Sequence, residues 1–264
     1  MKLYLVRHGR SAGNLPGRMT GWSEHALTDL GTEQARRVAA RLAPLGPMPI
    51  YASDLPRALD TARLIAARWA TPGVASADDT SAGAVSADAV SADGASADGA
   101  SSPAPRQVAG VVIDHRLREI DLGDYEGRPW DELTADQELS AAFAREPLTT
   151  RLPGGESLAM VRERVIAAFE EIARGEHAAA CLVSHDGPIR TILNHVLRIP
   201  PERHWAISTS HGGLSLLETS EDWVSVRFVN DTSHLRGLDA EEGASDAEAP
   251  DRTDGHSTEG GSEE

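Results

Sequence analysis

The chain has 264 residues, of which 40% are hydrophobic, and it carries a formal net charge of −16. No apolar run approaches the roughly 18–20 residues of a membrane span, so we expect no membrane partner. The acidic balance also argues against a nucleic-acid partner, which requires a basic surface. A single cysteine, Cys181, excludes an intramolecular disulfide and favours a reducing, cytoplasmic location.

The negative charge is concentrated in two segments. Residues 237–264 hold ten acidic side chains against one Arg (−9), and residues 71–106 hold five Asp against one Arg (−4), which leaves −3 elsewhere. The second segment repeats "SAD" and has almost no large apolar side chain, so it cannot bury enough surface to fold. We therefore expect one domain over 1–236, interrupted by a disordered insertion at about 72–106 and followed by a disordered acidic tail at 237–264.

The first seventy residues alternate between strand-like and helix-like patterns. "KLYLV" at 2–6 predicts a short apolar strand, and residues 28–45 have apolar side chains at helical spacing behind a possible threonine cap. Residues 49–54 predict a second strand. Residues 54–70 predict a helix that tolerates Pro56 in its first turn.

The same alternation continues after the predicted insertion. We expect a strand over 110–120, a helix over 156–175, a strand over 179–185 and a helix over 187–199, and two closing strands over 212–219 and 223–230. This order predicts an α/β fold, a three-layer α/β/α sandwich with a mostly parallel central sheet. In such sheets the reactive groups gather beyond the carboxyl ends of the strands.

Histidines and arginines follow these strand ends. The first strand runs into Arg7 and His8, the second leads to Asp54 and Arg57, and the strand over 179–185 ends on His185. One histidine after a strand is usually structural, but two histidines and two arginines at equivalent positions are hard to attribute to packing. They indicate a shared site.

Phosphoryl transfer is the chemistry that suits these residue types. Arginines match phosphate oxygens with forked donors, and a neutral imidazole can attack phosphorus and carry the phosphoryl group covalently. A metal site is the weaker interpretation, because ligand clusters at recognised spacings are missing. No GxxxxGK[ST] loop for a nucleoside triphosphate occurs.

Four motifs in this order carry a resemblance to a known family. "LVRHGRSAGN", "ASDLPRALDTA", "LREIDLGDYEG" and "LVSHDGPIR" resemble the histidine phosphatase superfamily, also called phosphoglycerate mutase-like, branch 1. The resemblance spans residues 1–235 apart from the insertion, and it is closest to the phosphatase branch. It implies a phosphohistidine intermediate on His8 and a phosphoryl site that includes Arg7, Arg57 and His185.

The resemblance also implies substrate contacts and no metal or other cofactor. Asn14 is a further expected contact of the phosphoryl group. "GRMTGW" at 17–22 is similar to the family's substrate-side loop, which makes Thr20 and Gly21 expected ligand contacts.

The proton donor cannot be chosen from composition alone. "LREIDLGDYEG" offers Glu119, Asp121, Asp124 and Glu126, any of which could protonate a leaving alkoxide and then activate water. The family pattern places the acid/base on the Glu of "LRE", which is Glu119, and assigns Glu126 to loop structure. The competing role for Glu119 is an ion pair with a neighbouring arginine.

Two positions depart from the family pattern. Arg10 stands where an acidic or amide residue is frequent, and it is either a solvated neighbour or part of a positive funnel for anionic substrates. Asp186 follows the second histidine where glycine is common, which leaves the catalytic set intact but could alter the substrate rim.

The sequence therefore predicts a metal-independent phosphomonoesterase acting on a small phosphorylated metabolite. A cofactor-dependent phosphoglycerate mutase would use the same residues, and a non-catalytic phospho-ligand-binding protein is a third hypothesis. The substrate and the oligomeric state are not predicted.

Overall fold

The computed structural model describes residues 1–14, 17–70, 105–108, 110–220 and 223–238. The expected insertion and acidic tail lie almost wholly outside the described residues. Residues 105–106 and 237–238 are the exceptions, and Arg106 already belongs to a strand of the sheet, inside the expected boundary of the insertion.

The described residues form one seven-stranded sheet with the order β3-β4-β2-β5-β1-β6-β7. The strands are β1 (Lys2–Arg7), β2 (Ile50–Ala52), β3 (Arg106–Val108), β4 (Val111–Ile113), β5 (Ala179–Ser184), β6 (Leu214–Thr219) and β7 (Val224–Asp231). The central strands β4, β2, β5 and β1 are parallel, as expected. The outer pairs β3–β4, β1–β6 and β6–β7 are antiparallel. The connections from β3 to β4 and from β6 to β7 are too short for a parallel crossover.

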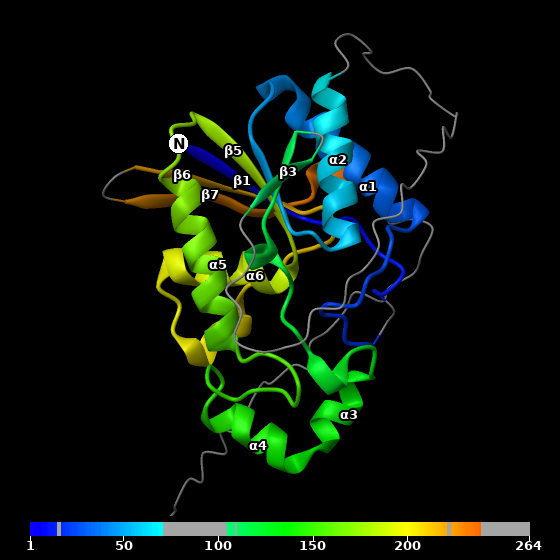
Figure 1. Cartoon of the computed structure of the whole chain (residues 1–264), viewed down its shortest axis with the longest axis vertical. Helices are drawn as coiled ribbons and strands as arrows, with labels where there is room; N and C mark the ends of the chain where they lie inside the picture. The colour runs from blue at the N-terminus through cyan, green and yellow to red at the C-terminus, as the bar shows by residue number, and fades with distance from the viewer. Residues whose placement is uncertain (15–16, 71–104, 109, 221–222, 239–264) are drawn as a thin grey trace, which may run out of the picture.

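Helices cover both faces of the sheet and make the expected three layers (Figure 1). Side chains alternate along β1: Tyr4 and Val6 pack in a cluster with α1 (Asp29–Leu42) and α2 (Pro56–Ala70). Leu3 and Leu5 pack in the opposite cluster with α5 (Leu158–Ala173) and α6 (Asp186–Leu197). Both cores depend on the two-residue period of a strand buried on both sides.

Local signals set the helix starts as predicted. The Thr28 hydroxyl accepts the Gly31 N–H at 3.0 Å and caps α1. Pro56 is the first residue of α2, where its missing N–H costs nothing. No helix in the described part of the chain is long and apolar enough to cross a membrane.

The segment after β4 differs from the expected long strand over 110–120. Asp114 ends the strand because its carboxylate accepts the Arg116 N–H at 2.9 Å and starts a 3-10 turn. This turn is η2 (His115–Leu117). Other short 3-10 turns among the described residues are η1 (Ala43–Leu45), η3 (Gly123–Tyr125), η4 (Pro201–Ala206) and η5 (Ser233–Leu235).

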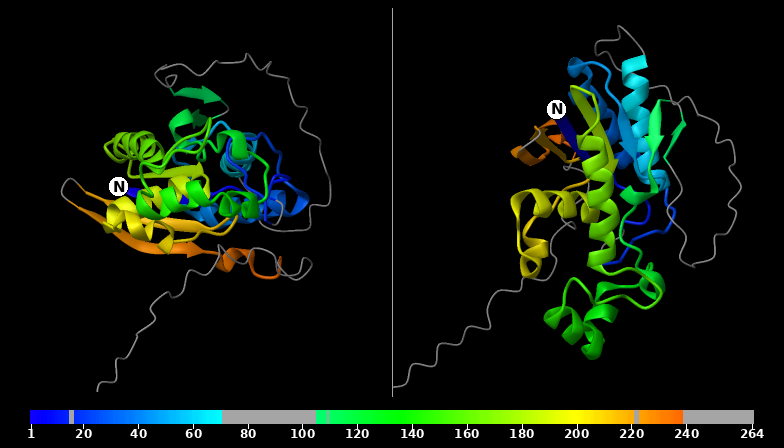
Figure 2. Two further views of the ribbon diagram at one scale, coloured as in Figure 1. Left: turned by 90° about the horizontal axis from the view of Figure 1, so that it is seen from below. Right: turned by 60° about the vertical axis from the view of Figure 1, so that its left-hand side comes forward.

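Two short helices were not predicted. α3 (Trp130–Ala135) and α4 (Gln137–Arg145) stand away from the layered body as a green pair at the bottom of the right-hand view of Figure 2. A small third core joins them to loops on both sides of them in the chain. Its buried members are Met19, Leu122, Tyr125 and Leu152, with Leu133, Leu139 and Phe143 packed against them.

Candidate active site

The parallel strands deliver their following residues to one edge of the sheet. His8 comes directly after β1, Ser53 after β2 and His185 after β5, while Glu119 follows β4 through η2. The His8 and His185 rings contact edge to face with centroids 4.9 Å apart. The residues predicted from strand ends therefore meet in space.

The His8 ring has a defined tautomer. Its Nε2 lies 3.2 Å from Nε of Arg57, which can only donate, so Nε2 must accept and is unprotonated. The proton is therefore on Nδ1, which donates to the Gly9 carbonyl at 2.6 Å. Burial, followed by the nearby His185 and Arg57, lowers the pKa of His8 well below its usual value. The side chain, only 2% exposed, thus presents a neutral ring with its lone pair on Nε2.

Arg57 is buried at the start of α2 and joins the histidine to a loop. Besides His8, its guanidinium donates to the carbonyls of Ser23 at 2.8 Å and Gly21 at 2.6 Å. Further along α2, the hydroxyl of Thr61 accepts the Gly9 N–H at 3.2 Å. Through Arg57 and Thr61, α2 thereby holds the His8 ring and the backbone of the following residue, Gly9.

Arg7 lies on the other side of His8. Its Nη1 donates to the Thr209 carbonyl, and its Nη2 lies 3.0 Å from Nε2 of His211. The His211 ring is also 5.4 Å from the His8 ring, centroid to centroid. Nε of Arg7 is buried and has no hydrogen-bond partner among the described residues.

His185 is fully buried at the N-cap of α6. Its Nε2 lies 2.9 Å from the Ser53 hydroxyl, and its Nδ1 has no hydrogen-bond partner in the part of the chain that the structure describes. Burial and the charges of Arg57 and Arg7 lower the pKa of His185 well below its usual value. Buried polar atoms are normally paired. Nε of Arg7 and Nδ1 of His185, which have no partner among the described residues, are therefore the atoms near His8 that are available to bind a polar ligand.

The Glu119 carboxyl approaches this group from the loop after η2. It accepts the N–H of Ile120 at 2.9 Å and that of Gly187 at 3.2 Å. Burial, then the nearby Asp186 carboxylate, raises the pKa of Glu119 above its usual value. A raised pKa favours the protonated acid that a leaving oxygen needs.

The competing role for Glu119, an ion pair with its arginine neighbours, is not what these side chains do. Arg116 pairs with Asp114 and Glu171 at 2.7 and 2.8 Å. Arg118 forms a two-pronged contact with Asp54.

The three predicted substrate contacts lie in a loop whose polar groups are hydrogen-bonded to one another and to Glu126 and Arg57. The Asn14 amide oxygen accepts the N–H of Ser11 at 2.9 Å, and the Thr20 hydroxyl donates to the Gly13 carbonyl at 2.6 Å. Gly21 donates its N–H to Glu126 at 3.1 Å and accepts from Arg57. Ligand contact by Asn14, Thr20 and Gly21 stays a prediction.

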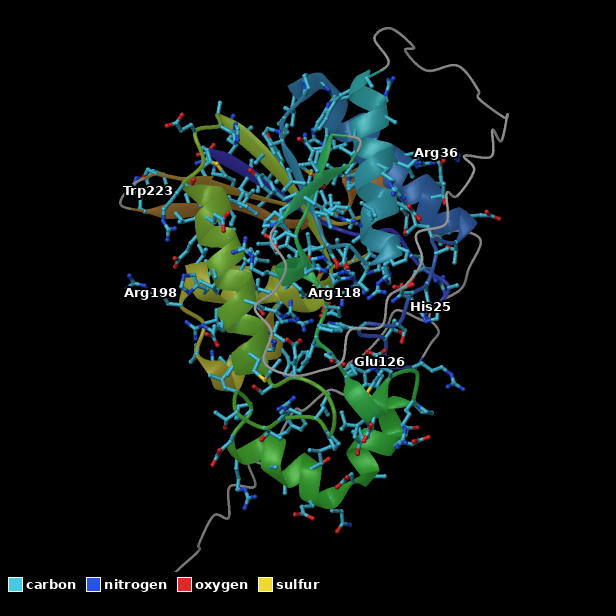
Figure 3. The ribbon with its side chains drawn as sticks, viewed as in Figure 1. His25, Arg36, Arg118, Glu126, Arg198 and Trp223 are labelled. Atoms are coloured by element: carbon cyan, nitrogen blue, oxygen red, sulfur yellow. The ribbon has the colours of Figure 1, made fainter. Side chains whose placement is uncertain are left out.

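Glu126 belongs to loop structure, as expected. Its carboxylate accepts the N–H groups of Gly21, Trp22 and Ser23, at 3.1, 2.6 and 3.4 Å. Because Arg57 holds the carbonyls of the same turn, the two side chains clamp it from opposite sides. Figure 3 shows Glu126 and Arg118 in the region between the strand ends and α3.

His211 is the member of the cluster that strand-end reasoning missed. It precedes β6, and β6 runs antiparallel to β1, so the start of β6 lies where β1 ends. The sequence carries no direct signal for this, because a hairpin of two closing strands fixes only their directions relative to each other and not relative to β1. Arg10 has a backbone role here: its N–H donates to Gln34 at 2.9 Å and its carbonyl accepts the Thr28 N–H at 3.0 Å.

Known proteins are similar to this chain over most of its length. The family described as the histidine phosphatase superfamily (branch 1) matches residues 3–78 and 96–232. "Probable phosphoglycerate mutase GpmB" of Enterobacter sp. (strain 638) is 30% identical over 243 residues, covering 89% of this chain and 95% of that protein.

Solved structures share the fold. The mycobacterial glucosyl-3-phosphoglycerate phosphatase in complex with VO3 is 26% identical with a TM-score of 0.63, over 87% of this chain and 98% of that one. The alpha-ribazole phosphatase of Shigella flexneri is 23% identical with a TM-score of 0.65, over 88% and 96% of the two chains.

Proposed function

The chain belongs to branch 1 of the histidine phosphatase superfamily and is an enzyme of that superfamily, and on this premise we propose that it is a metal-independent phosphomonoesterase acting on a small phosphorylated metabolite. The observation that carries the proposal is the His8 ring, neutral and with its Nε2 lone pair facing Arg57. This is the form of histidine that can attack phosphorus.

In the first step, the hydrogen bond from Nε of Arg57 to Nε2 of His8 breaks, the freed Nε2 lone pair attacks phosphorus, and the bond between phosphorus and the ester oxygen breaks. Glu119 gives its proton to the leaving oxygen, so an alcohol departs and a phosphohistidine remains. Arg7, Arg57 and His185 surround the phosphoryl oxygens, and the two guanidiniums stabilise the charge spread over them in the transition state.

In the second step, water hydrolyses the phosphohistidine. The Glu119 carboxylate accepts a proton from the water while its oxygen attacks phosphorus, and the phosphorus–nitrogen bond breaks. Inorganic phosphate leaves, Nε2 regains its lone pair and Glu119 is again protonated. One carboxyl thus serves as acid and then base.

A second candidate is phosphoglycerate mutase activity, which the name of the Enterobacter relative favours. Both activities pass through the same phosphohistidine and differ in what accepts the phosphoryl group. Hydrolysis needs water to reach the intermediate, whereas a mutase returns the group to the substrate.

The test is a screen of the purified protein on a panel of phosphorylated metabolites, with isomerisation of 3-phosphoglycerate measured in parallel. We expect phosphate release that survives a chelator and that His8→Ala reduces at least about 1,000-fold. His177→Ala, which changes an exposed histidine before β5, is the matched control.

Three results would go against the proposal. Substantial activity in His8→Ala would remove His8 as nucleophile, and complete loss with EDTA would indicate a metallophosphatase. Isomerisation much faster than phosphate release would assign the mutase activity instead.

A further inference from the structure

Asp186 is the first residue of α6 and directly follows His185. Its Oδ1 accepts the Thr209 N–H at 3.0 Å and the Thr209 hydroxyl at 2.7 Å, and its Oδ2 accepts from Arg190. Burial disfavours its charged form, but Arg7, Arg190 and the Thr209 bonds outweigh burial and lower the pKa of Asp186. The residue therefore supplies a fixed negative charge.

These contacts fasten the segment 207–209 to α6. Arg190, one turn beyond Asp186 on the same helix, donates from Nε to the Ile207 carbonyl at 2.6 Å. Asp186 holds the same segment two residues later, through both donors of Thr209. Both ends of the segment are thus tied to the helix.

The fastened segment holds the Arg7 guanidinium. The Thr209 carbonyl accepts from Nη1 of Arg7, and His211 lies 3.0 Å from Nη2. Asp186 itself is 4.0 Å from Nη1, within ion-pair range but not in a direct hydrogen bond. Its hold on Arg7 is therefore mainly indirect, through Thr209.

Asp186 also lies beside Glu119. The N–H of the next residue, Gly187, donates to the Glu119 carboxyl at 3.2 Å, so the Glu119 carboxyl contacts the same first turn of α6 that carries Asp186. A Cβ on Gly187 would lie 2.2 Å from Oε1 of Glu119, which shows how closely the two elements approach. The other charged group facing the Glu119 carboxyl is Arg57 from α2, while Arg164 of α5 contacts only the Glu119 backbone carbonyl.

We propose that Asp186 is a positioning residue that holds Arg7 through Thr209 and places a fixed negative charge beside Glu119. This inference rests on the proposed phosphatase function, because it gives one side chain a role toward both the phosphoryl-binding arginine and the proton donor. The charge disfavours ionisation of Glu119 and so extends the pH range in which the acid is protonated.

The experiment compares Asp186→Asn, Asp186→Ser and Thr209→Val with the wild type. Its readouts are the pH profile of kcat and the Kd of inorganic phosphate, measured by calorimetry. Asp60→Asn is the control, since it removes an exposed carboxylate whose partner is Arg63 on the same helix. Thermal melting of each variant reports whether it is folded.

We expect Asp186→Asn to move the alkaline limb of the kcat profile toward lower pH by about half a unit to one unit. Thr209→Val keeps the carboxylate, so its limb should stay in place, while its phosphate Kd should rise roughly 3- to 10-fold. Asp186→Ser should show both effects, and Asp60→Asn neither.

An unshifted limb in Asp186→Asn would overturn the charge role, and a phosphate Kd within twofold of wild type in Thr209→Val and Asp186→Ser would overturn the positioning role. If the Asp186 variants do not fold, the Kd of Thr209→Val alone decides the positioning role. If the wild type releases phosphate from no ester, the proposed function fails, but the Kd comparison can still be read because it needs no turnover.

Discussion

At the scale of single residues, the proposed chemistry is divided between His8 as nucleophile and Glu119 as acid, each set by its neighbours. Arg57 leaves the His8 lone pair on Nε2 by donating to it, and the Gly9 carbonyl holds the proton on Nδ1. Glu119 is biased toward its protonated form by burial and by Asp186, which raise its pKa. Burial and the neighbouring charges thus favour the working form of both groups, the neutral ring of His8 and the protonated carboxyl of Glu119.

Glu119→Gln provides the residue-scale prediction. Glutamine cannot protonate a leaving alkoxide, so kcat on an alkyl phosphate should fall about 100- to 10,000-fold. 4-Nitrophenolate leaves without a proton, so its release in the first step should persist, followed by slow hydrolysis of the phosphohistidine. Rapid-mixing kinetics should show a burst of one nitrophenolate per enzyme. Equal slowing of both substrates with no burst would contradict the role, and the exposed Glu163→Gln is the control.

At the scale of elements, close approaches between backbones and loops hold the site together. A Cβ on Gly9 would lie 2.1 Å from the Gly31 carbonyl oxygen of α1, which is backbone and cannot move aside. A Cβ on Gly187 would lie 2.2 Å from a carboxyl oxygen of Glu119, the far end of a flexible side chain. We therefore expect Gly9 to matter for stability and Gly187 for the position of the Glu119 carboxyl.

The matched substitutions Gly9→Ala and Gly187→Ala should separate these properties. Gly9→Ala must displace α1 from the loop after β1, so we expect a loss of about 2–4 kcal/mol in unfolding free energy. Gly187→Ala should change stability by less than about 1 kcal/mol but lower kcat at least about 10-fold, because Glu119 is pushed aside. Urea denaturation and kcat are the measurements. The prediction fails if both variants lose stability equally or if Gly187→Ala keeps full activity.

Element-scale reasoning also explains how much could be predicted from sequence. Buried parallel strands are continuous apolar runs, so the residues that end them, such as His8 and His185, could be located without a structure. The antiparallel edges and His211 could not, because His211 precedes its strand and the apolar pattern of β6 does not show that β6 runs antiparallel to β1. α3 and α4 are short, and Leu133 and Phe143 pack mainly on distant loop residues, so local periodicity gave little signal.

At the scale of the whole molecule, composition separates the folded body from its acidic segments. The body carries about −3 of the total charge, while residues 71–106 and 237–264 carry −4 and −9. We expect deletion of 76–102 together with 239–264 to change kcat less than twofold and Tm by only a few degrees. Steady-state kinetics and calorimetry of the truncated chain test this. A large drop in kcat would give the segments a functional role.

The whole molecule should also lose stability in mild acid because several histidines are buried in neutral form. Burial lowers the pKa of His8 and His185 well below 6.5, and it lowers that of His204 to about 4. Below pH 6.5 the unfolded chain therefore binds protons that the folded chain does not, so stability falls as the pH drops toward 4, by about 1 kcal/mol per unit for each such histidine. Glu119 and Asp121, whose raised pKa values act in the opposite direction, are fewer.

Urea denaturation at pH 7 and pH 5 should show this loss of stability. His204→Gln should reduce the loss, whereas the exposed His177→Gln should not. Equal slopes in both variants would mean that His204 is protonated in the folded protein.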